Sequence, residues 1–149
     1  MQAPQRSLSD AAVQRIVALF EQLSLQDLPR LAEIYTPDAR FKDPFNEVQG
    51  VAAIQGIFEH MFAALESPRF IIRDTVVQGE QCVLLWDFSF RMKRFNREAQ
   101  RIRGASHLKL AADGRILLHR DYWDAAEELY EKLPVLGVLM RWLKGRATR

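Results

Sequence analysis

A chain of 149 residues that is 48% hydrophobic is long enough to form one domain with its own core. Its 21 basic and 19 acidic side chains leave a net charge of +2, which excludes a broad basic surface for nucleic acid. The single cysteine, Cys82, excludes an internal disulfide, and no segment is long and apolar enough to span a bilayer. Since the first residues also lack the apolar core of a signal peptide, we expect a cytoplasmic protein.

The first half of the chain carries three helical patterns. The first helix is predicted to begin at Ser9, which can cap it, and its apolar residues keep helical spacing up to Leu23. A short second helix is predicted from Asp27, and a third from Val51 to Leu65. Almost no sheet is predicted in this half.

A short strand between the second and third helices stops at an Asp-Pro pair. Residues 35–45 read YTPDARFKDPF, and Pro44 cannot continue a ladder because it has no N–H. Asp43 is therefore held at a strand end between Phe41 and Phe45, where a partly desolvated carboxylate is a candidate general base. The alternative is that Asp43 only caps a turn, as Asp before Pro often does.

From Pro68 onward the pattern changes to strands. Four are predicted, at 70–77, 82–92, 100–110 and 115–123, so that helices and strands together predict an α+β domain. One face of the second strand is entirely apolar: Leu84, Trp86, Phe88, Phe90 and Met92. We expect this to be the outer face, and it predicts a homodimer because a monomer would leave the aromatic rings in water.

The order of these elements resembles the nuclear-transport-factor-2-like cone fold, which includes ketosteroid isomerases, limonene-epoxide hydrolases and SnoaL-like polyketide cyclases. The similarity to ketosteroid isomerase lies in Val13-Gln14-Arg15, Ala32 to Pro44, Gly50 with Ala52-Ala53-Ile54, and the hairpin around Gly114. It implies a cone-fold domain at residues 1–124, with three N-terminal helices packed on a curved, mainly antiparallel sheet. It also implies a pocket for a small hydrophobic molecule and no cofactor.

The isomerase resemblance implies that Asp43 is the general base. The two oxyanion donors of that family are missing, because Ile16 and Ser106 stand where it has a tyrosine and an aspartate. Phe58 likewise replaces a supporting tyrosine. Since losing one such donor costs about 3 kcal/mol of transition-state stabilisation, steroid isomerisation is not expected.

The sequence Arg120-Asp121-Tyr122-Trp123-Asp124 resembles the ending of the epoxide hydrolases. The resemblance implies an acid pair of Asp121 and Asp87, although Leu85 replaces the arginine that lies between the two acids in that family. His119 is either a proton shuttle beside Asp121 or a salt-bridged histidine of the sheet. No metal site is predicted, because these residues form no close-spaced ligand motif. The predicted pocket is lined by Ile16, Phe58, Ser106, Leu108 and Trp123.

Two functions from different classes follow. The first is a SnoaL-like protein that binds a small hydrophobic molecule and acts on it as an acid–base enzyme of isomerase, cyclase or hydrolase type. The alternative is a non-catalytic module of the same fold that binds a ligand or another protein, since fold alone does not decide function.

Residues 125–149 are predicted to form a helical extension. It begins with acids, breaks at Pro134, and then becomes apolar with a basic end. We expect it to pack on the domain rather than to lie on a membrane surface, because anionic lipid would repel its acidic first half.

Overall fold

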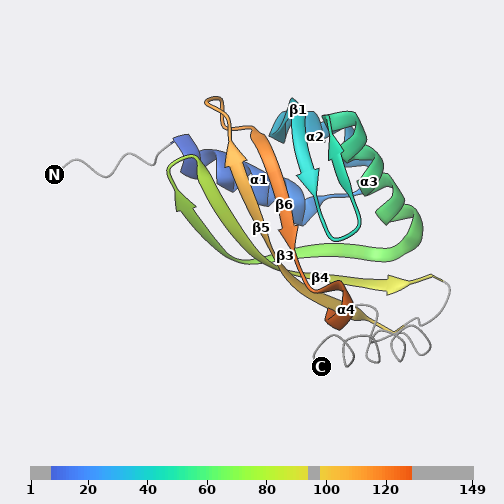
Figure 1. Ribbon diagram of the computed structural model, residues 1–149. Helices are drawn as coiled ribbons and strands as arrows, with labels where there is room; N and C mark the ends of the chain where they lie inside the picture. Colours follow the sequence, from blue (N-terminus) through green and yellow to red (C-terminus); the bar gives the residue numbers. More distant parts are fainter. Residues whose placement is uncertain (1–7, 94–97, 129–149) are drawn as a thin grey trace, which may run out of the picture.

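The computed structural model describes residues 8–93 and 98–128, and Figure 1 shows their arrangement. The predicted α+β class with a cone fold is confirmed. The elements in chain order are α1 (Leu8–Gln22), the 3₁₀ helix η1 (Leu25–Arg30), α2 (Leu31–Ile34), β1 (Tyr35–Lys42), β2 (Glu47–Gln49), α3 (Val51–Ala64), β3 (Leu65–Gln78), β4 (Gln81–Met92), β5 (Gln100–Leu110), β6 (Ile116–Tyr122) and α4 (Ala125–Glu128).

The predicted second helix is divided into η1 and α2. Its start is capped by Ser24, whose hydroxyl and backbone N–H donate to Asp27 Oδ2 at 2.7 Å and 3.1 Å. Pro29 lies inside η1 and cannot donate the hydrogen bond that an α-helical turn would need there. The α-helix therefore begins only at Leu31.

The sheet has the strand order β2-β1-β6-β5-β4-β3. Its four long strands are antiparallel neighbours, as predicted, whereas β2 and the parallel pairing of β1 with β6 were not predicted. In that pairing Phe41 lies opposite His119, and Lys42 opposite Arg120. Because parallel strands end at the same edge, the pairing brings the residues that follow Lys42 close to those that follow Arg120.

Helices α1 and α3 lie against one face of the curved sheet (Figure 1). The apolar face of β4 points toward these helices, so its predicted position on the outside is wrong. Trp86, Phe88 and Phe90 are only 5%, 8% and 4% exposed within one chain. Phe70 of β3 packs on them, with its ring centroid 4.6 Å from that of Phe88. Alternation shows which residues share a face, but the curvature of the sheet decides which face is enclosed. The homodimer stays a prediction, and this apolar face no longer supports it.

The outer face of β4 carries Asp87, which the resemblance had placed in the site. Its Oδ2 accepts hydrogen bonds from Arg73 Nε and Nη2 of β3 at 2.9 Å and 2.7 Å, and lies 3.7 Å from Arg101 Nη1 of β5. Asp87 is thus a buried carboxylate that pairs with two arginines across the outside of the sheet.

Most of the predicted C-terminal extension lies outside the described residues. Its first turn, α4, lies beside β5, where Glu128 Oε1 is 3.5 Å from Arg103 Nε. None of the described helices has the length and apolar character needed to cross a membrane.

Candidate functional site

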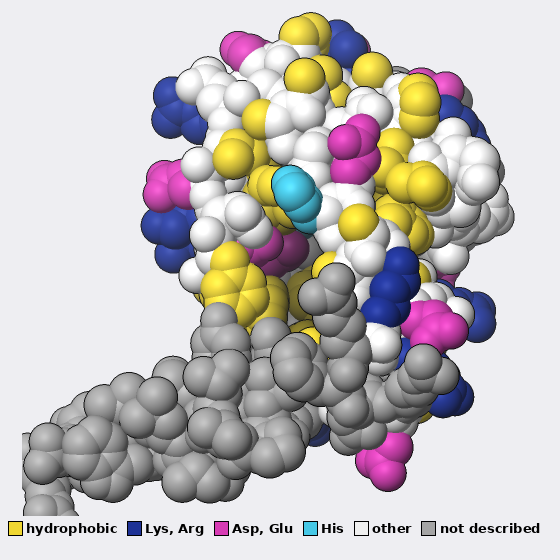
Figure 2. Space-filling model, turned by 90° about the vertical axis from the view of Figure 1, so that its right-hand side faces the viewer, with side chains coloured by type: hydrophobic (Ala, Val, Ile, Leu, Met, Phe, Trp, Pro, Cys, Tyr) yellow, Lys and Arg dark blue, Asp and Glu magenta, His cyan; other side chains and the backbone are white. Residues whose placement is uncertain are grey.

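A cavity of about 380 Å³ lies between the sheet and helix α3. This volume is in the range that small-molecule sites occupy. In the space-filling view, an acidic side chain is recessed in a hollow bordered by hydrophobic side chains and a histidine (Figure 2). Most of the lining is apolar, from residues Phe20, Phe41, Phe45, Ile57, Phe58, Met61, Ala64, Leu65, Phe70, Ile72, Leu84, Trp86, Phe88, Phe90, Met92, Ile102 and Trp123. The polar lining residues are Asp43, Asn46, His60, Ser106, His119 and Asp121.

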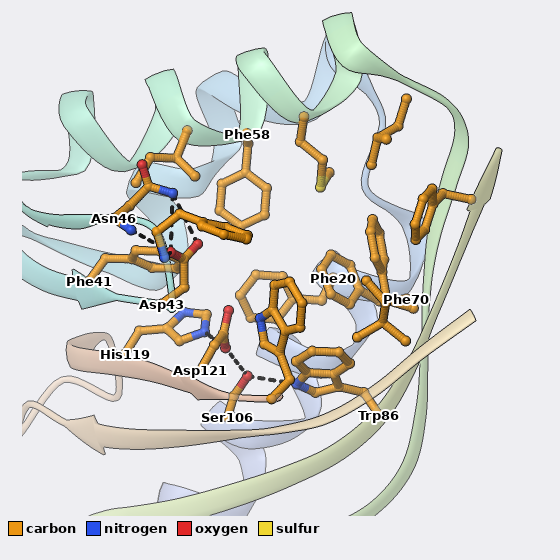
Figure 3. A pocket seen from close by; sticks show the side chains of 18 of the residues that line it. Phe20, Phe41, Asp43, Asn46, Phe58, Phe70, Trp86, Ser106, His119 and Asp121 are labelled. Atoms are coloured by element: carbon orange, nitrogen blue, oxygen red, sulfur yellow. Dashed lines mark hydrogen bonds and ion pairs between the residues drawn. The ribbon is translucent and has the colours of Figure 1, made fainter. Parts of the chain in front are cut away.

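Asp43 lines this cavity and also closes the turn after β1. Its Oδ1 accepts hydrogen bonds from the backbone N–H groups of Phe45 and Asn46, at 2.7 Å and 2.6 Å. The side-chain amide of Asn46 donates to both carboxylate oxygens, at 3.1 Å and 3.2 Å. Both interpretations of Asp43 thus describe its geometry: the carboxylate caps a turn and faces the cavity (Figure 3).

Asp121 is positioned by strand register. Ser106 of β5 lies opposite it, and the Ser106 hydroxyl donates to Asp121 Oδ1 at 2.5 Å. The indole Nε1–H of Trp86, on the next strand, donates to that hydroxyl at 2.8 Å. Gly104 makes room for the indole, because a Cβ there would lie 2.4 Å from a ring carbon of Trp86.

His119 connects Asp121 to a buried tyrosine. His119 Nε2 lies 2.6 Å from Asp121 Oδ1, and Nδ1 lies 2.6 Å from the hydroxyl oxygen of Tyr35. Burial, and secondarily the charge of Asp121, raise the pKa of the Tyr35 hydroxyl well above its usual value. Tyr35 therefore keeps its proton, and hydrogen bonds link its hydroxyl through the imidazole of His119 to Asp121.

The second carboxylate oxygen of Asp121 is a polar atom that remains for a ligand. Oδ1 receives the donors of Ser106 and His119, whereas Oδ2 receives no hydrogen bond from the residues that the structure describes. Figure 3 shows the carboxylates of Asp43 and Asp121 at the same end of the cavity, with Phe20 and Phe70 farther along it.

The structure brings together six of the residues predicted for the site. Asp43, Asp121, His119, Phe58, Ser106 and Trp123 all line the one cavity. Ile16 and Leu108 are instead fully buried in the core and are not part of the lining, and Asp87 points outward.

Sequence reasoning missed Tyr35, Trp86 and Asn46 as parts of the site. Tyr35 and Trp86 occupy positions typical of core residues, and their polar atoms have partners on neighbouring strands that are distant in the sequence. Asn46 had a signal, because a residue three positions after an aspartate can close an Asx-type turn on it.

Within the described ranges, no group of three or more His, Cys, Asp and Glu side chains is arranged to hold a metal ion.

The chain belongs to the SnoaL-like domain family, whose model matches residues 16–119. A search of curated proteins found no match. An NTF2-like protein of unknown function from Burkholderia pseudomallei has a TM-score of 0.71 at 18% identity, covering 82% of this chain and 95% of that one.

Two further solved structures of this fold contain a small molecule. A protein with a ketosteroid isomerase-like fold from Catenulispora acidiphila, in complex with trimethylamine, has a TM-score of 0.68 at 15% identity and covers 86% of this chain and 92% of that one. TerC, co-crystallised with polyporic acid, has a TM-score of 0.69 at 18% identity and covers 81% and 95%. Together with the family match, they confirm the predicted SnoaL-like family and its cone fold.

Proposed function

We propose that this SnoaL-like protein is an acid–base enzyme that takes a proton from a small hydrophobic molecule bound in the cavity, with Asp121 as the proton acceptor. The observation that carries the proposal is the geometry of Asp121: Oδ1 is held by two donors, and Oδ2 is left to a ligand. The cavity beside it is lined mostly by apolar and aromatic side chains, and this low polarity strengthens each electrostatic interaction with a ligand.

Asp43 is the competing base, and it is the one that the sequence predicts. Both of its oxygens accept hydrogen bonds within its own turn, so a ligand would share an oxygen that is already engaged. This difference favours Asp121 as the acceptor and Asp43 as the second charge that positions the ligand.

His119 acts through Asp121 in this proposal. The network behind it ends at Tyr35, which is completely buried and keeps its proton, so it offers no route for a proton to reach solvent. His119 is therefore a positioning residue that fixes the carboxylate of Asp121.

The test begins with native mass spectrometry of the purified full chain, which identifies a ligand carried from the cell. That ligand is then incubated with protein in D₂O, and deuterium incorporation is followed over time. We expect Asp121→Asn to slow exchange about 10²- to 10⁴-fold while binding persists.

Three other results would change the assignment. Loss of exchange in Asp43→Asn, with normal exchange in Asp121→Asn, would make Asp43 the base. Binding without exchange in the wild type would favour the non-catalytic binding module. Equal exchange in all three proteins would contradict both aspartates as bases.

A further inference from the structure

We propose that the cavity selects ligands that carry no negative charge, and that it holds most tightly an apolar molecule with a protonated amine at its polar end. This inference rests on the proposed function in one respect only: both place the ligand in the same cavity. The fold does not decide ligand charge, so the residues that line the site must do so.

The charge of the lining is one-sided. Asp43 and Asp121 both face the cavity, and no lysine or arginine is among its described lining residues. The basic residues Lys42 and Arg120 line an adjoining surface depression, which Asp43 and Asp121 also line. Lys42 Nζ lies 3.6 Å from Glu47, and the Arg120 guanidinium lies over the ring of Tyr122 at 4.7 Å, so both have partners outside the cavity.

Among the described residues, no lysine or arginine donates to either carboxylate. Asp43 receives backbone and side-chain amides, and Asp121 receives a serine hydroxyl and faces a ring nitrogen of His119. Hydrogen bonds from amides and a hydroxyl satisfy these oxygens without cancelling their charge. Two carboxylates therefore share an apolar enclosure that has no lysine or arginine among its described lining residues, and a cationic ligand would supply positive charge.

Aromatic rings add a second attraction for a cation at the same place. Phe45 and Trp123 meet edge to face, with centroids 5.6 Å apart, and both line the cavity that Asp43 and Asp121 also line. A ligand ammonium near a ring face is attracted by the negative centre of the ring. The ammonium thus gains both from the carboxylates and from the rings.

An anionic ligand meets the opposite situation. It would be desolvated beside two like charges, and the described lining offers it neither a lysine nor an arginine. Ser106 cannot donate to it, because its hydroxyl proton is already given to Asp121. For the same reason, proton transfer from a cationic substrate, which leaves it neutral, suits this site better than transfer that creates an anion.

The test uses three probes that share one skeleton: 4-phenylbutylamine, 4-phenylbutan-1-ol and 4-phenylbutanoate. Each is titrated into the full chain by isothermal titration calorimetry at pH 7, where an alkylamine is protonated and the acid is ionised. We expect the amine to bind about tenfold more tightly than the alcohol, and the carboxylate to bind more weakly than either. The net charge of +2 would by itself favour the anion, so a preference for the amine reports the cavity.

The variant for this test is Asp43→Asn combined with Asp121→Asn. Asp121→Asn keeps the oxygen that accepts both of its hydrogen bonds, and Asp43→Asn keeps the oxygen that accepts three of its four. Thermal melting checks the fold. We expect the amine to lose its advantage of about tenfold over the alcohol in this protein. The matched control is Asp113→Asn, the same chemical change at an exposed position in the β5–β6 turn. This variant should bind the three probes in the same order of affinity as the wild type.

The possible results separate this inference from the proposed function. Equal binding of amine and carboxylate by the wild type would overturn the inference, while deuterium exchange on a native ligand would still support the enzyme. An amine preference that survives in the double variant would also overturn it. An amine preference without any proton exchange would support the inference and contradict the enzyme.

Discussion

The two carboxylates at the end of the cavity are held in opposite ways. Asp43 is bound by Phe45 and Asn46, two and three residues along the chain. Asp121 is bound by Ser106, 15 residues away, and through His119 it depends on Tyr35, 84 residues from that histidine. The first arrangement needs only one turn to form, whereas the second needs β1, β4, β5 and β6 in the correct register. A change in packing should therefore disturb Asp121 and spare Asp43.

The largest loss of stability is expected from Gly104→Ala, which disturbs the contacts between strands that position Asp121. The added Cβ would lie 2.4 Å from the indole of Trp86, so the ring must move and lose its hydrogen bond to Ser106. Overpacking of this kind should lower the free energy of unfolding by about 2 to 3 kcal/mol, measured by urea denaturation.

The matched control for this substitution is Gly56→Ala in α3. Nothing lies within 4 Å of a Cβ at that position, and alanine is favoured over glycine in a helix by up to about 1 kcal/mol. Equal stability of the two variants would show that the indole does not depend on Gly104.

A smaller loss is expected from Tyr35→Phe, which removes the far end of the network. His119 Nδ1 would be left buried without its hydrogen-bond partner, at a cost of about 2 kcal/mol in unfolding free energy. The same substitution at Tyr122, which is half exposed, should change stability by no more than about 0.5 kcal/mol. If both tyrosines gave the same small change, the Tyr35–His119 hydrogen bond would contribute nothing measurable.

Alkaline pH should lower the free energy of unfolding through two buried groups of the sheet. Burial raises the pKa of the Cys82 thiol from 9.0 to about 11 and that of Tyr35 well above 10.0. Above pH 9 the unfolded chain loses protons that the folded chain keeps, so stability falls as pH rises, and the contribution of Cys82 is lost between pH 9 and about 11. The urea midpoint should therefore drop less between pH 8 and pH 10.5 in Cys82→Ala than in the wild type. An identical drop would exclude the thiol as a cause.

The smallest loss of stability is expected from a change in the turn that holds Asp43. Asp43→Ala removes the acceptor of its turn and should cost about 1 kcal/mol, by analogy with the loss of a helix cap. Amide hydrogen exchange should accelerate at Phe45 and Asn46 and stay unchanged at Ser106 and His119. Faster exchange at Ser106 as well would mean that the two carboxylates form one cooperative unit.

The sequence could predict what depends on neighbours along the chain. Helical spacing, strand alternation and the Asp-Pro turn are set by residues within a few positions, so the elements and the place of Asp43 were predictable from local patterns. Family resemblance added the order of the cone fold and the presence of Asp121 in the same cavity.

What depends on distant partners was decided only by the tertiary structure. The alternation of β4 is the same whichever face is enclosed, so it could not show that Trp86 points inward and Asp87 outward; the curvature of the sheet against α1 and α3 decides this. The parallel pairing of β1 with β6 likewise has no local signature, yet it sets Tyr35 beside His119 and Asp43 near Asp121. The physical reason is that register and curvature come from the packing of the whole sheet, to which each residue contributes only a small part of the free energy.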